Sequence, residues 1–362
     1  MNVGLVIYGS LDTTSGGYLY DRMLASHLKQ QGDAVEIISL PPGRYAPKLL
    51  DNFAPREPTG FDIILEDELC HPSLLRQHAR QHPCPIISIV HNLRSAQARM
   101  PQDAFYGFVE RWYLNRVDGF IFNSSATSKS VFAATRGPKP YVIAPPGGDR
   151  LGETREDAIT ARALERGPLR LVFLANVVRG KGLDILLDSL ERLPRSSYVL
   201  DVVGSCDVEP AYARRVQEIA LRTGQPVNFH GIVDHQPLAA ILESAHALVI
   251  PSQFEGFGIA YLEGMAHGLP ALGTTAGAIP ELVSDGIDGF LIAPGDAVTL
   301  SQRLALLGSD RRLLARMGIA ALHNYRSRPT WVASTELIRI FLLEIVKSRL
   351  ASPEGQRQRA SH

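Results

Sequence analysis

Two glutamates eight residues apart, Glu255 and Glu263, lie in the part of the sequence that offers the most chemistry. Glu255 stands in a loop beside Gly256 and Gly258, and Glu263 falls in a segment expected to form a helix that starts near Gly258. A helix N-terminus presents unpaired backbone amides and about half a positive charge, and glycines let a phosphate approach those amides closely. Two carboxylates separated by up to about 12 Å of helix could hold two hydroxyl-bearing parts of one extended ligand, with a phosphate between them.

The elements that position these residues alternate along the chain, because short apolar runs are followed by helix-like segments. Such alternation is typical of a parallel sheet that is covered by helices on both faces. In the first half we expect strands at 3–8, 34–39, 61–65, 85–90, 119–122 and 141–144, and helices at 18–31, 71–81, 102–116 and 124–136. We expect a loop at 41–58, and a linker plus a short irregular stretch at 145–168.

The alternation restarts after the linker, so a second domain of similar size is expected. Its strands are predicted at 169–175, 198–204, 227–231, 247–250 and 271–273, and its helices at 183–193, 211–224, 258–268, 296–325 and 331–350. We predict an α/β fold of two doubly wound, Rossmann-like domains facing across a cleft, with ligands beyond the carboxyl ends of the strands. The expected boundaries are 1–150, 151–330, a helix at 331–350 that packs back toward the first domain, and a flexible tail at 351–362.

The composition excludes several classes of protein. The 362 residues contain 37 basic and 37 acidic side chains, whereas a general nucleic-acid binder would show a basic excess. Three cysteines share no close spacing, and three histidines near two of them (His71, His78 and His82) do not match a zinc pattern, so we expect no metal site. We also expect neither a signal peptide nor a membrane span, which favours a cytoplasmic protein.

The segment from Glu255 to Glu263, E-GFGIAYL-E, resembles the Glu-x7-Glu signature of family four of the retaining glycosyltransferases with the GT-B fold. The resemblance extends over nearly the whole chain, and several further motifs follow in the family's order. They are the loop Ser15-Gly16-Gly17, the segment FNSSATSKS, the segment RGKGLDILLDSL and the stretch GLPALGTTAGAIPELVSDGIDGFLI.

In the second domain the resemblance assigns residues to the nucleotide sugar. It implies that Glu255 binds hydroxyls of the donor sugar and that Glu263 accepts hydrogen bonds from the ribose hydroxyls. Lys181 matches the lysine that neutralises the departing diphosphate. Backbone of the second domain is expected to bind the rest of the donor, at Gly231 and Ile232 for the base and at Gly256, Phe257, Gly258 and Ile259 for the sugar and diphosphate.

In the first domain, the turn at Gly16 and Gly17 is expected to reach the same diphosphate, and His91 matches the histidine beside the acceptor and the donor sugar. The sequence departs from the family at one position, where Asn176 replaces the usual arginine. Arg179, two residues before the lysine, is the alternative source of the second cation.

The predicted activity is transfer of a hexose, with retention, from a nucleotide sugar to a hydroxyl of a glycan, lipid or small-molecule acceptor. A UDP-sugar is favoured as donor, and GDP-mannose stays an alternative. Because cations and a helix N-terminus would stabilise the leaving group, no metal or other cofactor is expected. Two alternatives remain open: a nucleotide-sugar 2-epimerase of the same fold, and a non-catalytic nucleotide-sugar binder. A dinucleotide-dependent dehydrogenase is unlikely to fit, because the loop after the first strand lacks G-x-G-x-x-G.

The region 71–140 carries nine basic and three acidic residues, although the whole chain is neutral. Its arginines alternate with aromatic residues between positions 94 and 116. This pattern predicts either contact with anionic lipid headgroups at the inner face of a membrane or binding of a phosphorylated acceptor. An ordinary amphipathic helix of the domain explains the pattern equally well.

Overall fold

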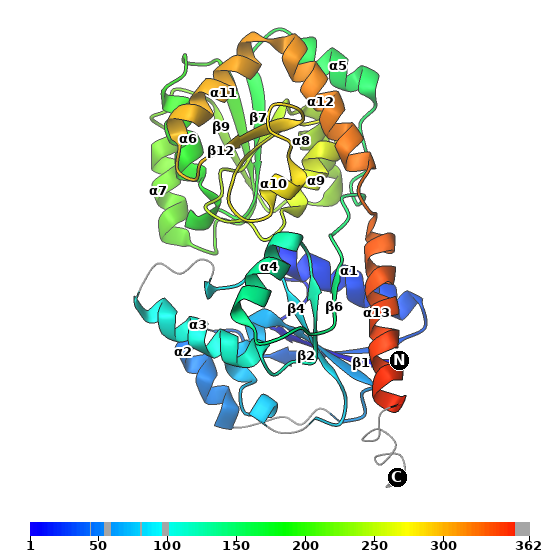
Figure 1. The fold of residues 1–362 in the computed structure, drawn as a ribbon. Helices are drawn as coiled ribbons and strands as arrows, with labels where there is room; N and C mark the ends of the chain where they lie inside the picture. Colours follow the sequence, from blue (N-terminus) through cyan, green and yellow to red (C-terminus); the bar gives the residue numbers. More distant parts are fainter. Residues whose placement is uncertain (44, 54–58, 80–81, 96–100, 352–362) are drawn as a thin grey trace. The chain divides into compact units, whose positions relative to one another are not determined.

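A computed structural model describes residues 1–43, 45–53, 59–79, 82–95 and 101–351, with the backbone alone for 101–103. The chain divides into two compact units. The first contains Met1–Pro146 together with the helix α13 (Trp331–Ala351), and the second is Gly147–Thr330. Each unit is built around its own six-stranded parallel sheet, as Figure 1 shows, so the predicted α/β class with two doubly wound sheets is confirmed.

In the first unit the strands lie in the order β2-β1-β3-β4-β5-β6. Their bounds are β1 (Asn2–Tyr8), β2 (Ala34–Leu40), β3 (Ile63–Asp67), β4 (Ile86–Val90), β5 (Gly119–Phe122) and β6 (Tyr141–Ile143). The helices are α1 (Gly16–Gln30), α2 (Tyr45–Lys48), α3 (Pro101–Leu114), α4 (Ser125–Ala134) and α13. Residues of α3 and α4, among them Tyr113 and Val131, form one buried cluster with Phe120 and Phe122 of β5.

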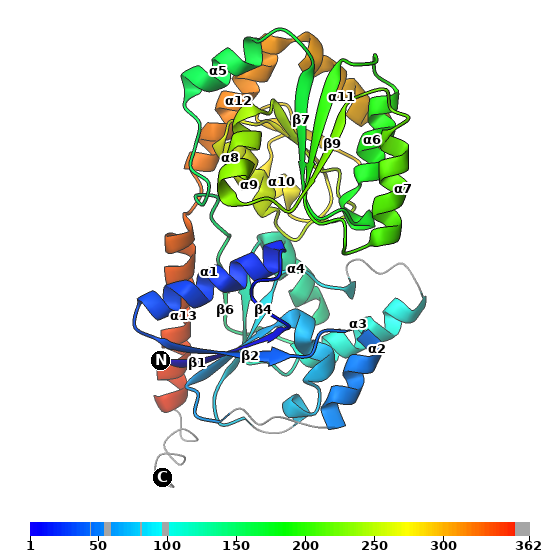
Figure 2. The ribbon, with the colours of Figure 1, turned by 180° about the vertical axis from the view of Figure 1, so that it is seen from behind.

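The helix α13 follows the whole second unit in the chain but packs on the first, against α1 and β6 (Figure 2). Its Ile338 and Leu342 are fully buried. At the sheet edge, Asp33 joins two distant parts of the chain: one carboxylate oxygen binds the amino group of Met1 at 2.7 Å and the other binds Nε of Arg339 at 2.7 Å. Helix α13 therefore packs against α1, and its ion pair through Arg339 also links it to Asp33, directly before β2.

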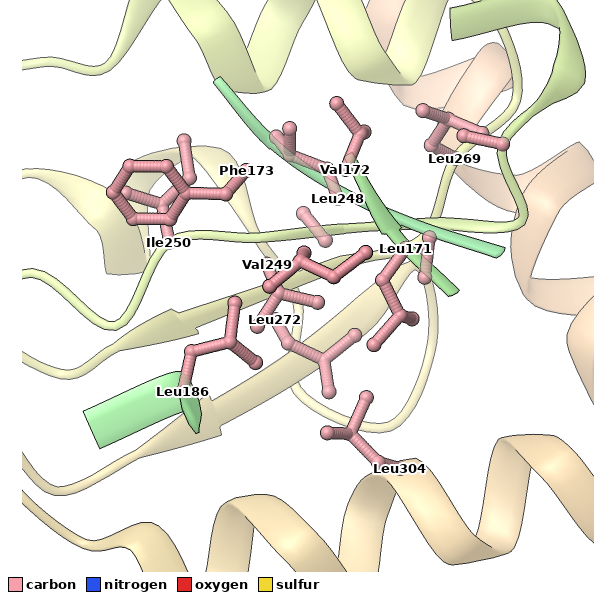
Figure 3. Close-up of a cluster of buried hydrophobic side chains, with 14 of the residues drawn as sticks. Leu171, Val172, Phe173, Leu186, Leu248, Val249, Ile250, Leu269, Leu272 and Leu304 are labelled. Atoms are coloured by element: carbon pink, nitrogen blue, oxygen red, sulfur yellow. The ribbon is translucent and has the colours of Figure 1, made fainter. Parts of the chain in front are cut away.

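In the second unit the strands lie in the order β12-β11-β10-β7-β8-β9. They are β7 (Leu169–Leu174), β8 (Tyr198–Val203), β9 (Val227–Gly231), β10 (Ala247–Val249), β11 (Ala271–Thr274) and β12 (Gly289–Ile292). The helices are α5 (Glu156–Leu164), α6 (Leu183–Glu191), α7 (Pro210–Ala220), α8 (His235–Ser244), α9 (Ile259–Ala266), α10 (Ile279–Leu282), α11 (Ala297–Ser309) and α12 (Arg311–Arg326), with a short turn η5 (Arg179–Lys181). Figure 3 shows side chains of β7, β10 and β11 packed with Leu186 of α6 and Leu304 of α11.

Several local predictions were wrong, each for a physical reason. The predicted helix 71–81 is replaced by two 3-10 turns, η2 (Glu68–Ser73) and η3 (Gln77–Ala79); the side chain of Asp67 accepts from the backbone N–H of Leu69 and starts the first turn before the predicted helix would begin. The helix expected over 296–325 is two helices, α11 and α12, since the side chain of Asp310 accepts from the backbone of Leu313 and starts a new helix.

Other predictions missed elements that the structure contains. The expected linker at 145–168 includes α5, and α8, α10 and β12 were not predicted. Part of the expected loop at 41–58 forms α2 and a 3-10 turn, η1 (Leu49–Phe53), whereas 44 and 54–58 lie outside the described residues. Residues 80–81 of the expected helix 71–81 and residues 352–362 of the expected tail also lie outside them. No helix in the described part of the chain has both the length and the apolar character needed to cross a membrane.

Candidate active site

The first part of the candidate site lies at the carboxyl edge of the second sheet. The loop 250–258 leads from β10, which pairs with β11 and β7, into α9. Gly258 precedes the helix with a φ of +97°, a left-handed conformation that favours glycine. Among the described residues no side-chain hydrogen bond caps α9, and its first turn carries no acidic residue. The helix therefore begins with polar amides that suit an anionic ligand.

An ion pair lies in front of this helix. Nζ of Lys181, at the end of η5, is 2.5 Å from Oε2 of Glu255, and the hydroxyl of Ser252 is 3.4 Å from the same oxygen. The side chains are 30% and 13% exposed respectively, so a ligand can reach both. The fold thus brings together Lys181 and Glu255, which come from two different sequence motifs and are 74 positions apart.

The backbone of Glu255 is held from the other side by a tight turn. The backbone N–H of Ala278 donates to the carbonyl oxygen of Glu255 at 2.9 Å. Gly277, with a φ of +71°, passes so close that a Cβ placed there would lie 2.1 Å from that oxygen. The turn at Gly277 and Ala278 therefore restricts the position of the Glu255 backbone.

Glu263 lies on α9, four residues after the first residue of the helix, Ile259, and is 4% exposed. Its Oε1 accepts two hydrogen bonds from Arg150, at 3.1 Å from Nε and 2.6 Å from Nη2. Nη1 of Arg150 is 2.8 Å from Nε2 of His235, the first residue of α8. Burial raises the pKa of the Glu263 carboxyl, and the Arg150 guanidinium opposes part of this rise. Sequence reasoning missed Arg150, since it stood in the expected linker and no local spacing connects it to a residue 113 positions away.

The two candidates for the family's arginine make contacts with other parts of the second unit. Oδ1 of Asn176 accepts from the backbone N–H of Ser205 at 3.1 Å. Arg179 is exposed, and its guanidinium carbon lies 5.8 Å from the centre of the Tyr212 ring.

The backbone positions expected at the donor lie at strand or helix ends of the same unit. Gly231 ends β9, and its carbonyl accepts from the backbone of Gly204 at 2.8 Å. Ile232, directly after it, is 58% exposed. Gly256 and Phe257 precede α9, with the Phe257 ring buried, and Ile259 is the first residue of the helix.

The remaining candidates lie at the carboxyl edge of the first sheet. His91 follows β4 directly, and its Nε2 is 3.0 Å from Oδ1 of the fully buried Asp21 of α1. A Cβ built on Gly17 would lie 3.0 Å from Cδ2 of His91, so a glycine here lets the first turn of α1 approach the imidazole. Gly16 begins the same helix and is exposed, after the N-cap Ser15. The structure therefore brings Gly17 and His91 together, with Asp21 as a partner that sequence reasoning missed.

A second acid, Asp67, lies close to Asp21 and His91. One ligand atom each of Asp21, Asp67 and His91 lies within 4.8 Å of the other two, a spacing that could hold a cation. Burial raises the pKa of Asp67 to about 7. Burial alone would lower the pKa of His91, but the Asp21 carboxylate outweighs it and raises that pKa to about 9. His91 is thus an imidazolium ion at neutral pH, already paired with Asp21.

Comparison with known proteins adds a family to this geometry. Residues 168–310 match the family model described as glycosyl transferases group 1. The chain is 30% identical over 257 residues to a D-inositol 3-phosphate glycosyltransferase of Streptomyces avermitilis, covering 67% of this chain and 55% of that protein. It is 27% identical over 311 residues to an MMP alpha-(1->4)-mannosyltransferase of Mycolicibacterium hassiacum, covering 80% and 71%. The chain spans about half or less of the length of several other curated relatives that it matches.

Solved structures share the fold at low sequence identity. A sucrose-phosphate synthase from Thermosynechococcus elongatus superposes with a TM-score of 0.82 at 19% identity, covering 96% of this chain and 99% of that one. Anabaena HepE in complex with UDP-glucose gives 0.72 at 18% identity, covering 95% and 100%. WaaG, described as a glycosyltransferase of lipopolysaccharide biosynthesis, gives 0.68 at 17% identity, covering 94% and 99%.

Proposed function

Because residues 168–310 belong to the group 1 glycosyl transferases and the chain has the GT-B fold, we propose that it is a glycosyltransferase. It transfers a hexose from a nucleotide sugar to a hydroxyl group, with retention at the anomeric carbon. A UDP-sugar is the favoured donor and GDP-mannose the alternative. The acceptor is a glycan, a lipid or a small molecule.

The observation that carries this proposal is a pair of carboxylates, Glu255 in the loop before α9 and Glu263 on α9, each paired with a cation. Breaking the bond between sugar and diphosphate leaves negative charge on the leaving oxygen, which preorganised donors stabilise. Lys181 and the amides at the start of α9 supply such donors. When Lys181 turns to the diphosphate, Glu255 becomes free to accept hydrogen bonds from the sugar hydroxyls, while Glu263 serves the ribose.

The names of similar proteins support the donor class. One relative is called a mannosyltransferase, and one structure of similar fold was solved with UDP-glucose. The acceptor is proposed to bind at the carboxyl edge of the first sheet, where His91 stands beside Gly17. There the imidazolium of His91 would donate a hydrogen bond to an oxygen of the bound carbohydrate.

We propose that the reaction needs no metal or other cofactor, because Lys181 and the amides of α9 neutralise the leaving group. Turnover measured in excess EDTA tests this. An unchanged rate supports the proposal. A loss that Mg²⁺ or Mn²⁺ restores would contradict it and would direct attention to Asp21, Asp67 and His91.

We further propose a cytoplasmic protein that contacts anionic membrane surfaces through α3. On this helix Phe105 and Phe108 are 55% and 60% exposed, and Arg111 is exposed beside them. Exposed aromatic rings next to a cation suit the headgroup region of an anionic bilayer. Sedimentation with phosphatidylglycerol vesicles should exceed that with phosphatidylcholine vesicles, and replacing both Phe residues by Ser should abolish the difference. Equal sedimentation with both vesicles would contradict the contact.

Incubation with UDP-glucose, UDP-galactose, UDP-N-acetylglucosamine and GDP-mannose, followed by mass spectrometry, tests the main proposal. Release of the nucleoside diphosphate with transfer or slow hydrolysis of the sugar is expected. A donor converted to an isomer of unchanged mass would indicate a 2-epimerase, and binding without conversion would indicate a non-catalytic binder. Glu255→Gln should lose turnover and stay folded, whereas Glu218→Gln, on the exposed face of α7, should not change it.

A further inference from the structure

Arg150, which belongs to none of the sequence motifs, donates two hydrogen bonds to Glu263, the carboxylate proposed to bind the ribose. We infer that Arg150 is a positioning and specificity-determining residue for the nucleotide: it holds Glu263 as an oriented hydrogen-bond acceptor that selects a ribose over a deoxyribose. This inference rests on the proposed function, because it takes Glu263 as the ribose contact.

The geometry leaves one side of the carboxylate for a ligand. Both hydrogen bonds from Arg150 end on Oε1 of Glu263, so Oε2 remains for sugar hydroxyls. Arginine has five N–H donors, of which three are used here, two on Glu263 and one on His235. With its side chain 21% exposed, Arg150 also has an accessible surface at this point.

Arg150 bridges the two parts of the unit that the nucleoside is expected to touch. His235 lies three residues after Ile232, which is matched to the base, and Glu263 lies on α9. The backbone just before Arg150 is pressed against the same helix, because a Cβ built on Gly148 would lie 2.6 Å from Cβ of Leu262. The guanidinium is therefore held in one place by packing as well as by its hydrogen bonds.

The contact between Arg150 and Glu263 also affects the pKa of the Glu263 carboxyl. Arg150 is the charged group in contact with Glu263, and the titratable group next to Arg150 is His235, which accepts a hydrogen bond from it. Burial raises the pKa of Glu263, and Arg150 is the main group that opposes the rise. Without Arg150 the carboxyl would take up a proton more readily, and a neutral carboxyl accepts weaker hydrogen bonds than a carboxylate. Ribose binding would then weaken, most of all at low pH.

The test is calorimetric titration of the full chain with UDP and 2′-deoxy-UDP at pH 6 and pH 8, repeated with GDP and 2′-deoxy-GDP. Wild type should prefer the ribonucleotide by about tenfold or more, as expected for a hydrogen bond to a charged group. In Arg150→Met this preference should fall toward one, with the larger loss at pH 6. Arg150→Lys should keep part of it. Arg155→Met, at an arginine that is 85% exposed and paired with Asp157, is the matched control and should behave as wild type.

The outcomes separate the inference from the proposed function. Wild type that binds none of the four nucleotides would overturn both. Wild type that binds them, with an unchanged ribose preference in Arg150→Met, would overturn the inference alone and leave Arg150 as a structural contact. If Arg150→Met does not fold, Arg150→Lys provides the test. A ribose preference in Arg150→Lys equal to that of wild type at both pH values would contradict the inference that both hydrogen bonds from Arg150 to Glu263 are needed.

Discussion

The turn at Gly277 makes a sharp test of how the Glu255 loop is positioned. Gly277 has a φ of +71°, and a Cβ built there would lie 2.1 Å from the carbonyl oxygen of Glu255 and 2.9 Å from its carbonyl carbon and amide nitrogen. Real Cβ atoms essentially never come within 3.0 Å of such atoms, so Gly277→Ala must move the two backbones apart by about 0.9 Å. The atoms in collision belong to the main chain, and no change of rotamer can relieve it.

Two costs follow from this geometry. An alanine at positive φ costs about 1–2 kcal/mol of conformational strain, which lowers the free energy of unfolding. A displacement of about 1 Å in a group that binds the reacting sugar can cost about 100-fold in rate. Gly277→Ala should therefore lower kcat/KM by roughly two orders of magnitude while the second unit stays folded.

Gly286→Ala is the matched control, because its φ is +77° and no described atom lies within 4 Å of a Cβ built there. It carries the same backbone strain without the collision. Urea unfolding and donor turnover are measured for both variants. The positive φ should cost both variants about 1–2 kcal/mol of stability. Gly277→Ala should lose more than Gly286→Ala because of the collision, and it alone should lose turnover. Turnover of Gly277→Ala within about threefold of wild type, or an equal loss in Gly286→Ala, would refute the reasoning.

Three further predictions follow from contacts described above. Lys181→Met should lower kcat by about 10²–10³, as for removal of one charge-stabilising donor, whereas the exposed Lys129→Met should not; similar rates would exclude Lys181 from the leaving-group site. Because Asp21 raises the pKa of His91 from 6.5 to about 9, the ion pair contributes stability that is fully present below pH 6.5 and lost as the pH rises through about 9. Asp21→Asn should remove this window, which an NMR titration of His91 and urea midpoints at several pH values would reveal; an unchanged His91 titration would contradict it. Leu248→Ala, at a fully buried position of β10, should cost about 2–5 kcal/mol in urea unfolding, and a cost below about 1 kcal/mol would show a looser core.

Much of the fold could be predicted from local pattern. The run Gly119–Phe122 was predicted with the bounds that β5 has, because a fully buried parallel strand is apolar along its length. A helix was predicted at 124–136, and α4 (Ser125–Ala134) is capped by Ser124, whose side chain accepts from the backbone of Thr127. The helix α10 escaped prediction, since its four residues are too few to show a helical period.

The candidate site was predictable only where the chemistry is local. Glu255 and Glu263 share one motif, so their spacing identifies both. Their partners come from elsewhere, with Arg150 113 positions before Glu263 and Asp21 70 positions before His91. Such pairs depend on tertiary packing, which no single-sequence pattern encodes.

The path of the chain through the two units has a consequence for how the protein is made. Met1–Pro146 is synthesised before Gly147–Thr330, but α13, which packs on α1 and pairs with Asp33 through Arg339, is synthesised after it. Between them lies the uninterrupted stretch Gly147–Thr330, which contains every residue of its own sheet. Domains usually fold on the ribosome in the order in which they are synthesised. Here the second unit can fold before the first is complete, because the first unit also needs α13.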